Sequence, residues 1–196
     1  MFAMEIGAMS IHKRELKRRY DMTAHFYDRR YGEIQRRKYD VVLANIPNTD
    51  RILDVGCGTG MLLGSLGGRA RLVVGVDMSV KMLRAAKKRA PSAFLVLVDA
   101  DHLPFADGSF DVAVSVTLLQ NMPDPSKTVR EVARVLKPNG VAIITSLKRK
   151  HSQKQLADWA SDANLEPLKT WEILNSEDII CIARRVQSSD NRPRNL

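Results

Sequence analysis

The chain has 196 residues and a mass of 22.0 kDa, carries a net charge of +9 with a pI near 9.8, and is 44% hydrophobic. Its two cysteines, Cys57 and Cys181, lie in unrelated contexts, and no apolar run approaches the roughly 18 residues of a membrane span, which excludes disulfide-stapled, zinc-ribbon and membrane-spanning proteins. We therefore expect one soluble globular domain in a reducing cytoplasm, with no metal, no membrane association and no signal peptide.

The first fifty residues have a helical pattern. Apolar and aromatic residues recur there at intervals of three or four: Leu16, Tyr20, Ala24, Tyr27, Tyr31 and Ile34. This pattern predicts one or two helices, interrupted at Gly32 and ended by Pro47, that form an N-terminal helical cap over residues 1–50. The side of the helix that carries these apolar and aromatic residues either packs on a core, covers a ligand, or does both through different residues.

From residue 51 onward, short runs rich in Val, Ile and Leu alternate with amphipathic segments, which is typical of an α/β fold with a parallel sheet. We predict strands over residues 51–55, 72–76, 93–98, 111–116 and 141–146, each buried on both faces. Helices are expected from Gly60, from Ser79 to Arg89, and over residues 125–136. The sequence Pro138-Asn139-Gly140 predicts a turn into the fifth strand.

The C-terminal part continues this alternation. A helix is expected after Ser152, followed by strands over residues 168–174 and 178–186. The short turn at residues 175–177 implies that these two strands are antiparallel. We therefore predict a core domain over residues 51–186 and a disordered tail over residues 187–196.

The strongest motif is a glycine loop. The apolar strand 51–55, which includes Asp54, leads directly into Gly56, Cys57, Gly58, Thr59 and Gly60 at the start of a helix. Glycines at alternating positions allow a ligand to approach the backbone, and free amides at a helix start offer donors. The spacing does not match the dinucleotide pattern G-x-G-x-x-G, and Asp54 would attract a cationic amine and repel a pyrophosphate.

Two further acidic residues follow successive strands. Asp77 ends the second strand, where its carboxylate is placed to accept hydrogen bonds from two ribose hydroxyls, and Met78 beside it can lie on an adenine ring. Asp99 ends the third strand, where it can accept a hydrogen bond from the exocyclic amine of adenine. Because open α/β sheets bind ligands at the carboxyl ends of their strands, the three acids together indicate a nucleoside-type ligand.

With these residues the chain resembles a class I S-adenosylmethionine-dependent methyltransferase, of the broad family that includes ubiquinone-biosynthesis enzymes. The resemblance covers about residues 20–186. It rests on the loop 54–60, Asp77, the segment 99–105, the strand start at Phe110-Asp111 and the segment 131–140.

This resemblance implies a Rossmann-like, seven-stranded, mostly parallel sheet with the last strand antiparallel and helices on both faces. It implies S-adenosylmethionine as cofactor. Asp54, Gly56, Cys57, Gly58 and Gly60 would surround the methionine moiety. The resemblance further places Asp77 on the ribose and Asp99 with the Ala100 amide on adenine. An N-terminal Tyr-Asp segment, here Tyr27-Asp28, would cover the cofactor.

Methyl transfer is an in-line displacement in which positioning of the acceptor supplies much of the acceleration. A proton lost by the acceptor still needs a destination, and the candidates are His25, Tyr27, Tyr31, His102, Gln120, Asn121 and His151. Gln120 and Asn121 follow the fourth strand, where the acceptor pocket of the family lies. We therefore predict that Gln120, Asn121 and Tyr27 act on the acceptor.

Charge and loop length bear on the acceptor. Basic residues form two clusters: Lys13, Arg14, Lys17, Arg18 and Arg19, and then Lys148, Arg149, Lys150, His151 and Lys154. They are either solvated faces or a rim that contacts phosphates. Only residues 147–151 separate the fifth strand from the next helix, which predicts an open cleft. We expect RNA, either rRNA or tRNA, to be methylated there on a base nitrogen.

Two alternatives stay open. A small-molecule methyltransferase acting on a quinone or phenol predicts a closed, aromatic-lined pocket under Tyr27 and Tyr31. A cofactor-binding subunit that activates a partner predicts cofactor affinity without methyl transfer. The enzyme itself could also require a small activating protein subunit.

Overall fold

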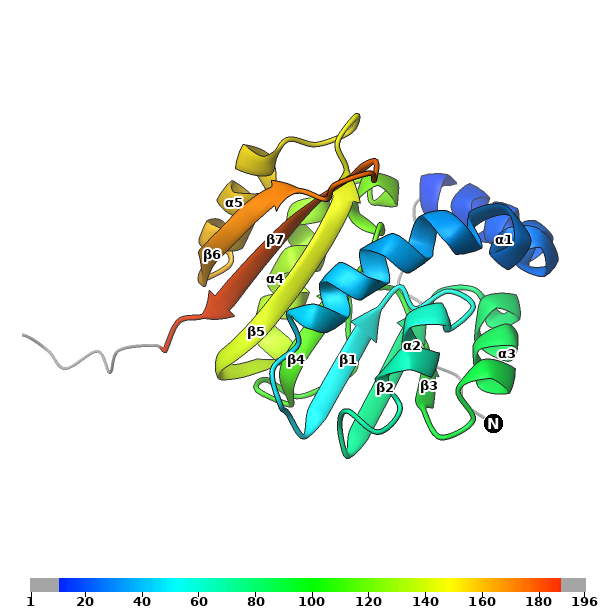
Figure 1. The fold of residues 1–196 in the computed structure, drawn as a ribbon, viewed down its shortest axis with the longest axis horizontal. Coiled ribbons are helices and arrows are strands. Elements are labelled where there is room, and N and C mark those ends of the chain that lie inside the picture. The colour runs from blue at the N-terminus through cyan, green and yellow to red at the C-terminus, as the bar shows by residue number, and fades with distance from the viewer. Residues whose placement is uncertain (1–10, 188–196) are drawn as a thin grey trace, which may run out of the picture.

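The structure is a computed structural model that describes residues 11–187, and for residues 24–34 it describes the backbone alone. Figure 1 shows a central sheet with helices on both sides. The strands are β1 (Arg51–Val55), β2 (Leu72–Asp77), β3 (Phe94–Leu97), β4 (Phe110–Ser115), β5 (Leu136–Leu147), β6 (Leu165–Glu172) and β7 (Asp178–Arg185). The helices are α1 (Ile11–Ala44), α2 (Met61–Leu66), α3 (Val80–Arg89), α4 (Pro125–Val135) and α5 (Gln153–Asp162), with a 3₁₀ turn η1 (Leu119–Asn121) after β4.

The sheet has seven strands in the order β3-β2-β1-β4-β5-β7-β6. Strands β1 to β5 pair in parallel, whereas β7 is antiparallel to both of its neighbours, β5 and β6. The predicted α/β architecture with an antiparallel last strand is therefore confirmed. The strand order reverses between β1 and β4, and at such a point the carboxyl ends of the strands form a ligand crevice.

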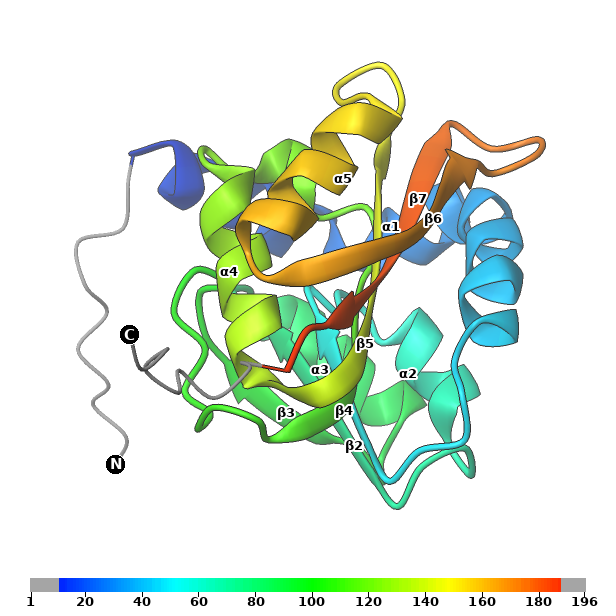
Figure 2. The same ribbon diagram turned by 90° about the vertical axis from the view of Figure 1, so that its left-hand side faces the viewer.

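Helices cover the two faces of the sheet, as Figure 2 shows. On one face α4 and α5 pack through Val129, Val132 and Leu156 against strand residues that include Leu53. On the other face α1, α2 and α3 pack against strand residues that include Ile52. Because side chains alternate along a strand, the parallel strands in the middle of the sheet are apolar on both faces.

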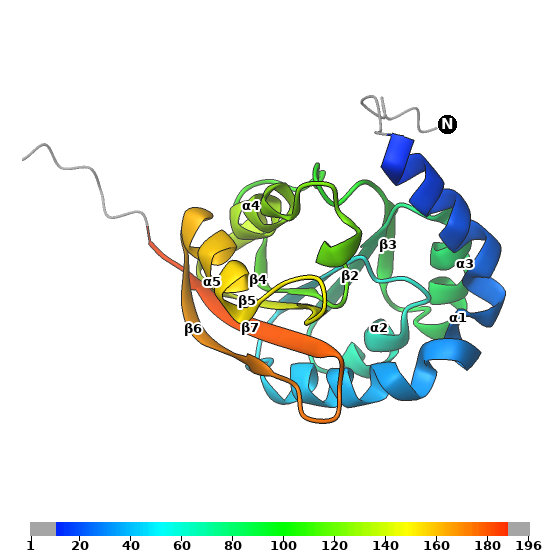
Figure 3. The same cartoon turned by 90° about the horizontal axis from the view of Figure 1, so that it is seen from above.

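Helix α1 continues through Gly32 without the predicted interruption and ends before Pro47. Seen from above, it curves around the outside of α3 and α2 (Figure 3). Its C-terminal half is held by the buried Lys38, whose Nζ lies 2.7 Å from Asp178 Oδ2 of β7 and donates to Thr117 Oγ1 at 3.0 Å. Tertiary contacts thus outweigh the low helix propensity of one glycine.

Three strands differ from their predictions. Strand β3 was expected to be buried on both faces, but it is the edge of the sheet, and Phe94 is 65% exposed. Strand β5 begins at Leu136, and the expected turn at residues 138–140 is a bulge within it, with Asn139 at φ 64°. The predicted β6 also begins earlier, at Leu165, directly after Asn164 at φ 60°. The predicted tail, residues 187–196, lies almost entirely outside the described residues.

Candidate active site

The glycine loop joins β1 to α2 and is tied to the end of β2. The amides of Gly56 and Cys57 both donate to Val76 O at 2.9 Å, and the Gly60 amide donates to Cys57 O at 3.0 Å. The Gly58 amide donates to Asp77 Oδ2 at 3.0 Å. The protein itself therefore binds these four amides and uses them to fix the loop.

Two glycines show why the loop needs this residue type. Gly58 and Gly60 have φ values of 55° and 75°, which disfavour residues with a Cβ. A Cβ on Gly58 would meet no atom within 4 Å, so the backbone there faces open space. A Cβ on Gly60 would lie 2.8 Å from Ala86 Cα. Gly58 thus leaves room beside the loop, while Gly60 permits α2 to pack on α3.

Asp54 lies immediately before the loop and is 2% exposed. Its Oδ2 atom is buried and has no hydrogen-bond partner within residues 11–187. Burial, together with the negative charge of Asp77, raises the pKa of Asp54 to about 8. A buried carboxylate oxygen without a partner costs free energy, and a cationic amine bound beside it would remove that cost.

Cys57 does not expose its thiol to the loop surface. The side chain packs in the apolar core with Leu62 and Leu63, and burial raises the pKa of the thiol well above its usual value. Cys57 is therefore unsuited to act as a nucleophile.

Asp77 connects the glycine loop to α3. Besides the bond from Gly58, its Oδ1 accepts from the Ser79 amide at 2.8 Å, and burial raises its pKa. Ser79 caps α3 by accepting from the Met82 amide, and its hydroxyl donates to Asp21 Oδ1 of α1 at 2.5 Å. Met78, between them, is half-buried. The sequence did not point to Ser79 or Asp21 as neighbours of Asp77.

Asp99 follows β3 and is bound by Lys13, a member of the first basic cluster, which was predicted to be either a solvated face or a phosphate-contacting rim. Lys13 Nζ donates to Asp99 Oδ1 at 2.6 Å and Oδ2 at 2.8 Å, and to Asp101 Oδ2 at 2.5 Å. Lys13 is buried, so it is not a surface cation. Ala100 is half-buried and packs against the core. The N-terminal end of α1 thus covers the carboxylate predicted to bind adenine.

Gln120 and Asn121 lie in η1, at the carboxyl end of β4. The Gln120 side-chain amide donates to Thr117 O, and Asn121 Nδ2 donates to Tyr20 Oη of α1 at 2.9 Å. Burial raises the pKa of Tyr20, so it stays neutral and can accept this bond. The side chain of Tyr27, the third predicted residue, lies outside the described side chains, as do those of His25 and Tyr31.

His151 reaches the same region from the β5–α5 connection. Its Nδ1 lies 2.7 Å from the hydroxyl of the buried Ser146, which donates to Gln120 Oε1 at 3.4 Å. Its ring packs edge-on against Trp159 at 4.9 Å. Burial, and secondarily the charge of Lys150, lower the pKa of His151. The structure therefore brings Gln120 together with a neutral imidazole through Ser146, a residue that no sequence motif singled out.

The two basic clusters are less available than the sequence suggested. In the first, Lys13 is buried, and Lys17 pairs with Asp21 at 2.8 Å. In the second, Lys148 pairs with Glu172 at 3.6 Å and Lys154 with Asp158 at 2.7 Å. The exposed members without an ion pair among the described residues are Arg14, Arg18, Arg19, Arg149 and Lys150.

Comparison with known proteins agrees with this geometry. Residues 53–144 match the family described as a methyltransferase domain. The chain is 31% identical over 189 residues to a malonyl-[acyl-carrier protein] O-methyltransferase of Marinomonas sp., covering 86% of this chain and 69% of that protein. It is 35% identical to a ubiquinone biosynthesis O-methyltransferase of Thiobacillus denitrificans over 55% of this chain, and it spans about half, 48%, of that relative.

Among solved structures, the methyltransferase in a complex with the Haloferax volcanii Trm112 methyltransferase activator superposes with a TM-score of 0.73. It is 20% identical, and the match covers 85% of this chain and 97% of that one. At this identity the likeness shows the fold. Together with the sequence relatives, it establishes that the chain belongs to the class I S-adenosylmethionine-dependent methyltransferases, and its predicted enzymatic class and cofactor are confirmed.

The described residues fit the cofactor of this family. The partnerless oxygen of Asp54 suits the cationic amine of the methionine moiety, and the open space at Gly58 leaves room for it. None of the helices within residues 11–187 is long and apolar enough to cross a membrane. In the same range no three His, Cys, Asp or Glu side chains are grouped as they would be to hold a metal ion.

Proposed function

We propose that the protein methylates a base nitrogen of RNA, either rRNA or tRNA. The observation that carries this proposal is the short connection between β5 and α5. It consists of residues 148–152, of which Lys148, Arg149 and Lys150 are exposed and basic. This connection adds no helix over the carboxyl ends of β4 and β5, so the acceptor side can take a large anionic substrate.

In this proposal S-adenosylmethionine, when bound, supplies a methyl group on a sulfonium. Asp54 holds its amine, Asp77 its ribose, and Asp99 with the Ala100 amide its adenine, beside Gly56, Cys57, Gly58, Gly60 and Met78. Gln120 and Asn121 orient the acceptor base through their amides, and Tyr27 of α1 contacts it. The proton lost by the base nitrogen passes to the neutral imidazole of His151 and from there to water.

A second candidate acceptor is a small molecule of the quinone or phenol type. The observation that favours it is the set of relatives, which includes demethylmenaquinone and ubiquinone-biosynthesis methyltransferases. It requires Tyr27 and Tyr31 to line a closed pocket. A quinone or phenol acceptor would leave the basic connection between β5 and α5 without a role.

We also propose that this methyltransferase is cytoplasmic and that it works with a small activating protein subunit. The supporting observation is that the Haloferax methyltransferase of similar fold is in a complex with the Trm112 activator. Reduced buried thiols, Cys57 and Cys181, fit a cytoplasmic location.

The proposal is tested by incubating the protein with methyl-labelled cofactor and total RNA from cells that lack it. We expect label in RNase-sensitive material and one methylated nucleoside identified by mass spectrometry. An Asp54→Asn variant should incorporate no label, while the matched surface variant Asp158→Asn should behave as the wild type. Label that enters only a lipid extract would contradict the RNA assignment and favour the quinone alternative.

A further inference from the structure

Helix α3 is rich in basic residues and contains no acidic residue. Five of its ten residues are basic, and the chain has no acidic residue between Asp77 and Asp99. The buried side of the helix is apolar, with Met82, Leu83 and Ala86 against the core. All of its charge is therefore directed away from the sheet, without any acidic partner on the same helix.

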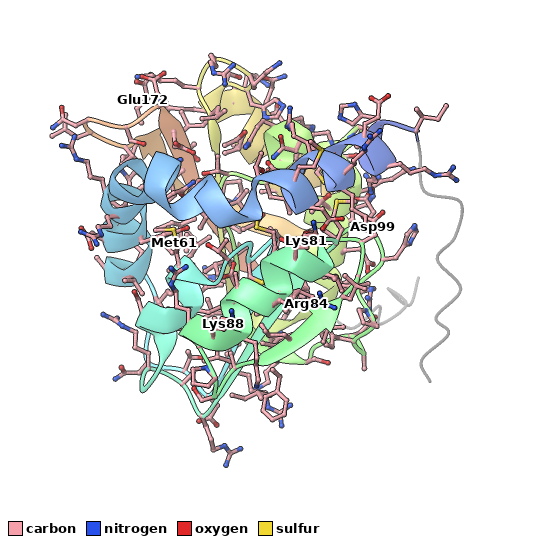
Figure 4. The ribbon with its side chains drawn as sticks, turned by 90° about the vertical axis from the view of Figure 1, so that its right-hand side faces the viewer. Met61, Lys81, Arg84, Lys88, Asp99 and Glu172 are labelled. Carbon is pink, nitrogen blue, oxygen red and sulfur yellow. The ribbon has the colours of Figure 1, made fainter. Side chains whose placement is uncertain are left out.

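Two of the five cations already serve the fold. Lys87 donates to Pro91 O at 2.7 Å, and Arg89 donates to Thr59 O at 3.0 Å. The other three, Lys81, Arg84 and Lys88, are exposed and form no ion pair with any described side chain. At 100° per residue they fall within a sector of roughly 60° on one side of the helix. Figure 4 shows these three side chains along the outer side of α3, below α1.

The N-terminal part of α1, next to α3, adds two further exposed cations. Asp21 of α1 is bonded to Ser79 at the start of α3, which fixes the side of α1 that faces α3. Arg14 and Arg18 lie seven and three residues before Asp21, on the same side, and both are exposed. We call Arg14, Arg18, Lys81, Arg84 and Lys88 the α3 cationic surface. Asp21 itself is paired with Lys17, so it does not neutralise this surface.

An exposed aromatic ring shares a groove with one of these cations, Arg84. Arg84 lines a groove of about 490 Å³ whose other wall is the open edge of the sheet, with Phe94 and Leu97 of β3. Phe94 is 65% exposed and Leu97 is 45% exposed. Val80 of α3 lines the same groove and is 38% exposed, so these three side chains form a contiguous apolar patch of the kind that marks an interaction surface.

We propose that the α3 cationic surface and Phe94 form the RNA-binding surface of this methyltransferase. Phosphates lie along Arg14, Arg18, Lys81, Arg84 and Lys88, and one unpaired base stacks on Phe94. The inference rests on the proposed RNA substrate and adds where that substrate is held. The N-terminal end of this surface adjoins the cofactor site, because Ser79, which caps α3, shares Asp77 with the glycine loop. Phe94 is in register with Val74 of β2 and lies three residues further from that edge of the sheet.

Nucleic acid fits this surface better than a membrane or an acidic protein does. Single-stranded RNA is bound by cations that follow the backbone together with aromatic rings that stack on bases, and both features are present here. A membrane-binding helix would carry its apolar residues on its own exposed side. On α3 the exposed residues are basic apart from Val80 at its first position, which is 38% exposed, and Phe94 lies on a neighbouring strand.

The test compares two charge-matched double variants of the full chain. Arg84→Gln/Lys88→Gln removes two cations of the α3 cationic surface. Lys127→Gln/Arg130→Gln removes two exposed cations of α4, on the other face of the sheet. Anisotropy of a labelled oligouridylate, measured from 50 to 200 mM salt, should show roughly tenfold weaker binding and a shallower salt dependence for the α3 variant. The α4 variant should bind as the wild type does.

Phe94→Ala separates stacking from charge. We expect roughly tenfold weaker binding of the oligouridylate with an unchanged salt dependence, while Leu174→Ala, an even more exposed apolar control, has no effect. Unchanged melting temperature and unchanged affinity for S-adenosylhomocysteine show that each variant is folded.

Three outcomes would overturn the inference. The first is equal loss of binding in the α3 and α4 variants. The second is binding of phosphatidylserine vesicles or polyglutamate that is as tight as RNA and is lost in the same α3 variant. The third is RNA binding by the wild type that the α3 and Phe94 variants retain, which overturns this surface but leaves the proposed function intact. A wild type that neither binds nor methylates RNA would refute the proposed function as well.

Discussion

The two ends of α1 are anchored by the same kind of contact in very different surroundings. Lys13 near its start and Lys38 near its end are both buried, and each binds carboxylates of the core. Lys38 binds Asp178, which is fully buried and also accepts from Thr117 and Ser176. Lys13 binds Asp99 and Asp101, and Asp99 is a residue that the cofactor is expected to contact.

This difference indicates which end of the helix responds to ligands. Nothing proposed for cofactor or substrate requires the Lys38–Asp178 pair to open, so that end is permanent. At the other end, Lys13 occupies both carboxylate oxygens of Asp99, to which adenine is proposed to bind. We therefore expect cofactor binding to be linked to the position of the N-terminal turns of α1 and independent of its C-terminal anchor.

The largest expected effect is a loss of stability when the C-terminal anchor of α1, the Lys38–Asp178 pair, is broken. Lys38→Met leaves the Asp178 carboxylate buried without its cation, and we expect the free energy of unfolding in urea to fall by about 3–5 kcal/mol. Adding Asp178→Leu should recover much of the loss, because it removes the unpaired charge. Arg36→Met, two residues earlier and exposed, is the control and should change stability little. A Lys38→Met protein as stable as this control would show that the C-terminal anchor is not needed.

The next largest effect is expected at Asp54, whose buried Oδ2 has no hydrogen-bond partner among the described side chains. Asp54→Asn keeps the shape of the side chain and removes its charge, so we expect affinity for S-adenosylhomocysteine to fall by roughly 100-fold in calorimetry. The Asp158→Asn control should keep wild-type affinity. Unchanged binding by Asp54→Asn would mean that the amine of the cofactor lies elsewhere.

The raised pKa of Asp54, about 8, adds a pH dependence with a definite sign. Between pH 4 and 8 the folded protein holds a proton that the unfolded chain has lost, so the free energy of unfolding falls as pH rises through this range. Asp54→Asn should remove that part of the decrease and be relatively more stable at pH 8. Binding of the cationic amine must release the proton. Cofactor affinity should therefore increase from pH 6 to 7.5, by at most about tenfold per unit.

A smaller change in cofactor affinity is expected when Lys13, at the N-terminal end of α1, is replaced. Lys13→Met frees both oxygens of Asp99 for adenine, and we expect about fivefold tighter binding of S-adenosylhomocysteine, since a charged hydrogen bond no longer has to be exchanged. The neighbouring exposed Arg14→Met should leave this affinity unchanged. Weaker binding by Lys13→Met would show that Lys13 helps to hold the cofactor and does not compete with it.

The same comparison shows what the sequence can and cannot predict. The strands and the glycine loop follow from local patterns: apolar runs, alternating glycines, and acidic residues where strands end. The partners of those acids do not, because Lys13 and Asp99 are 86 residues apart and only the packing of α1 brings them together. A run of basic residues looks alike in sequence whether its members are buried, as Lys13 is, or exposed, as Arg14 is.

The sequence also does not show that β3 lies at the edge of the sheet. Strand β3 is as apolar as β2, so its pattern predicts burial on both faces, yet it pairs only with β2 and leaves Phe94 exposed. On the acceptor side, Gln120 and Asn121 were identified by their place after β4. Ser146 was not, because a serine at the end of a buried strand gives no signal until His151 and Gln120 are found on either side of it.

The smallest expected effect is a change in the pKa of His151. It tests whether charges near the N-terminal end of α1 influence the titration of this residue. The groups around His151 are Lys150 beside it, Ser146 of β5 and Trp159 of α5. Lys150→Gln removes the charge that helps to lower the pKa of His151, so this pKa should rise by several tenths of a unit in an NMR titration. It should stay below the ordinary value because burial, the larger cause, is unchanged. Lys154→Gln, whose cation is already paired with Asp158, should shift it less, and Lys13→Met should not shift it. A shift in Lys13→Met as large as that in Lys150→Gln would show that the N-terminal end of α1 acts on the acceptor side as well as on the cofactor.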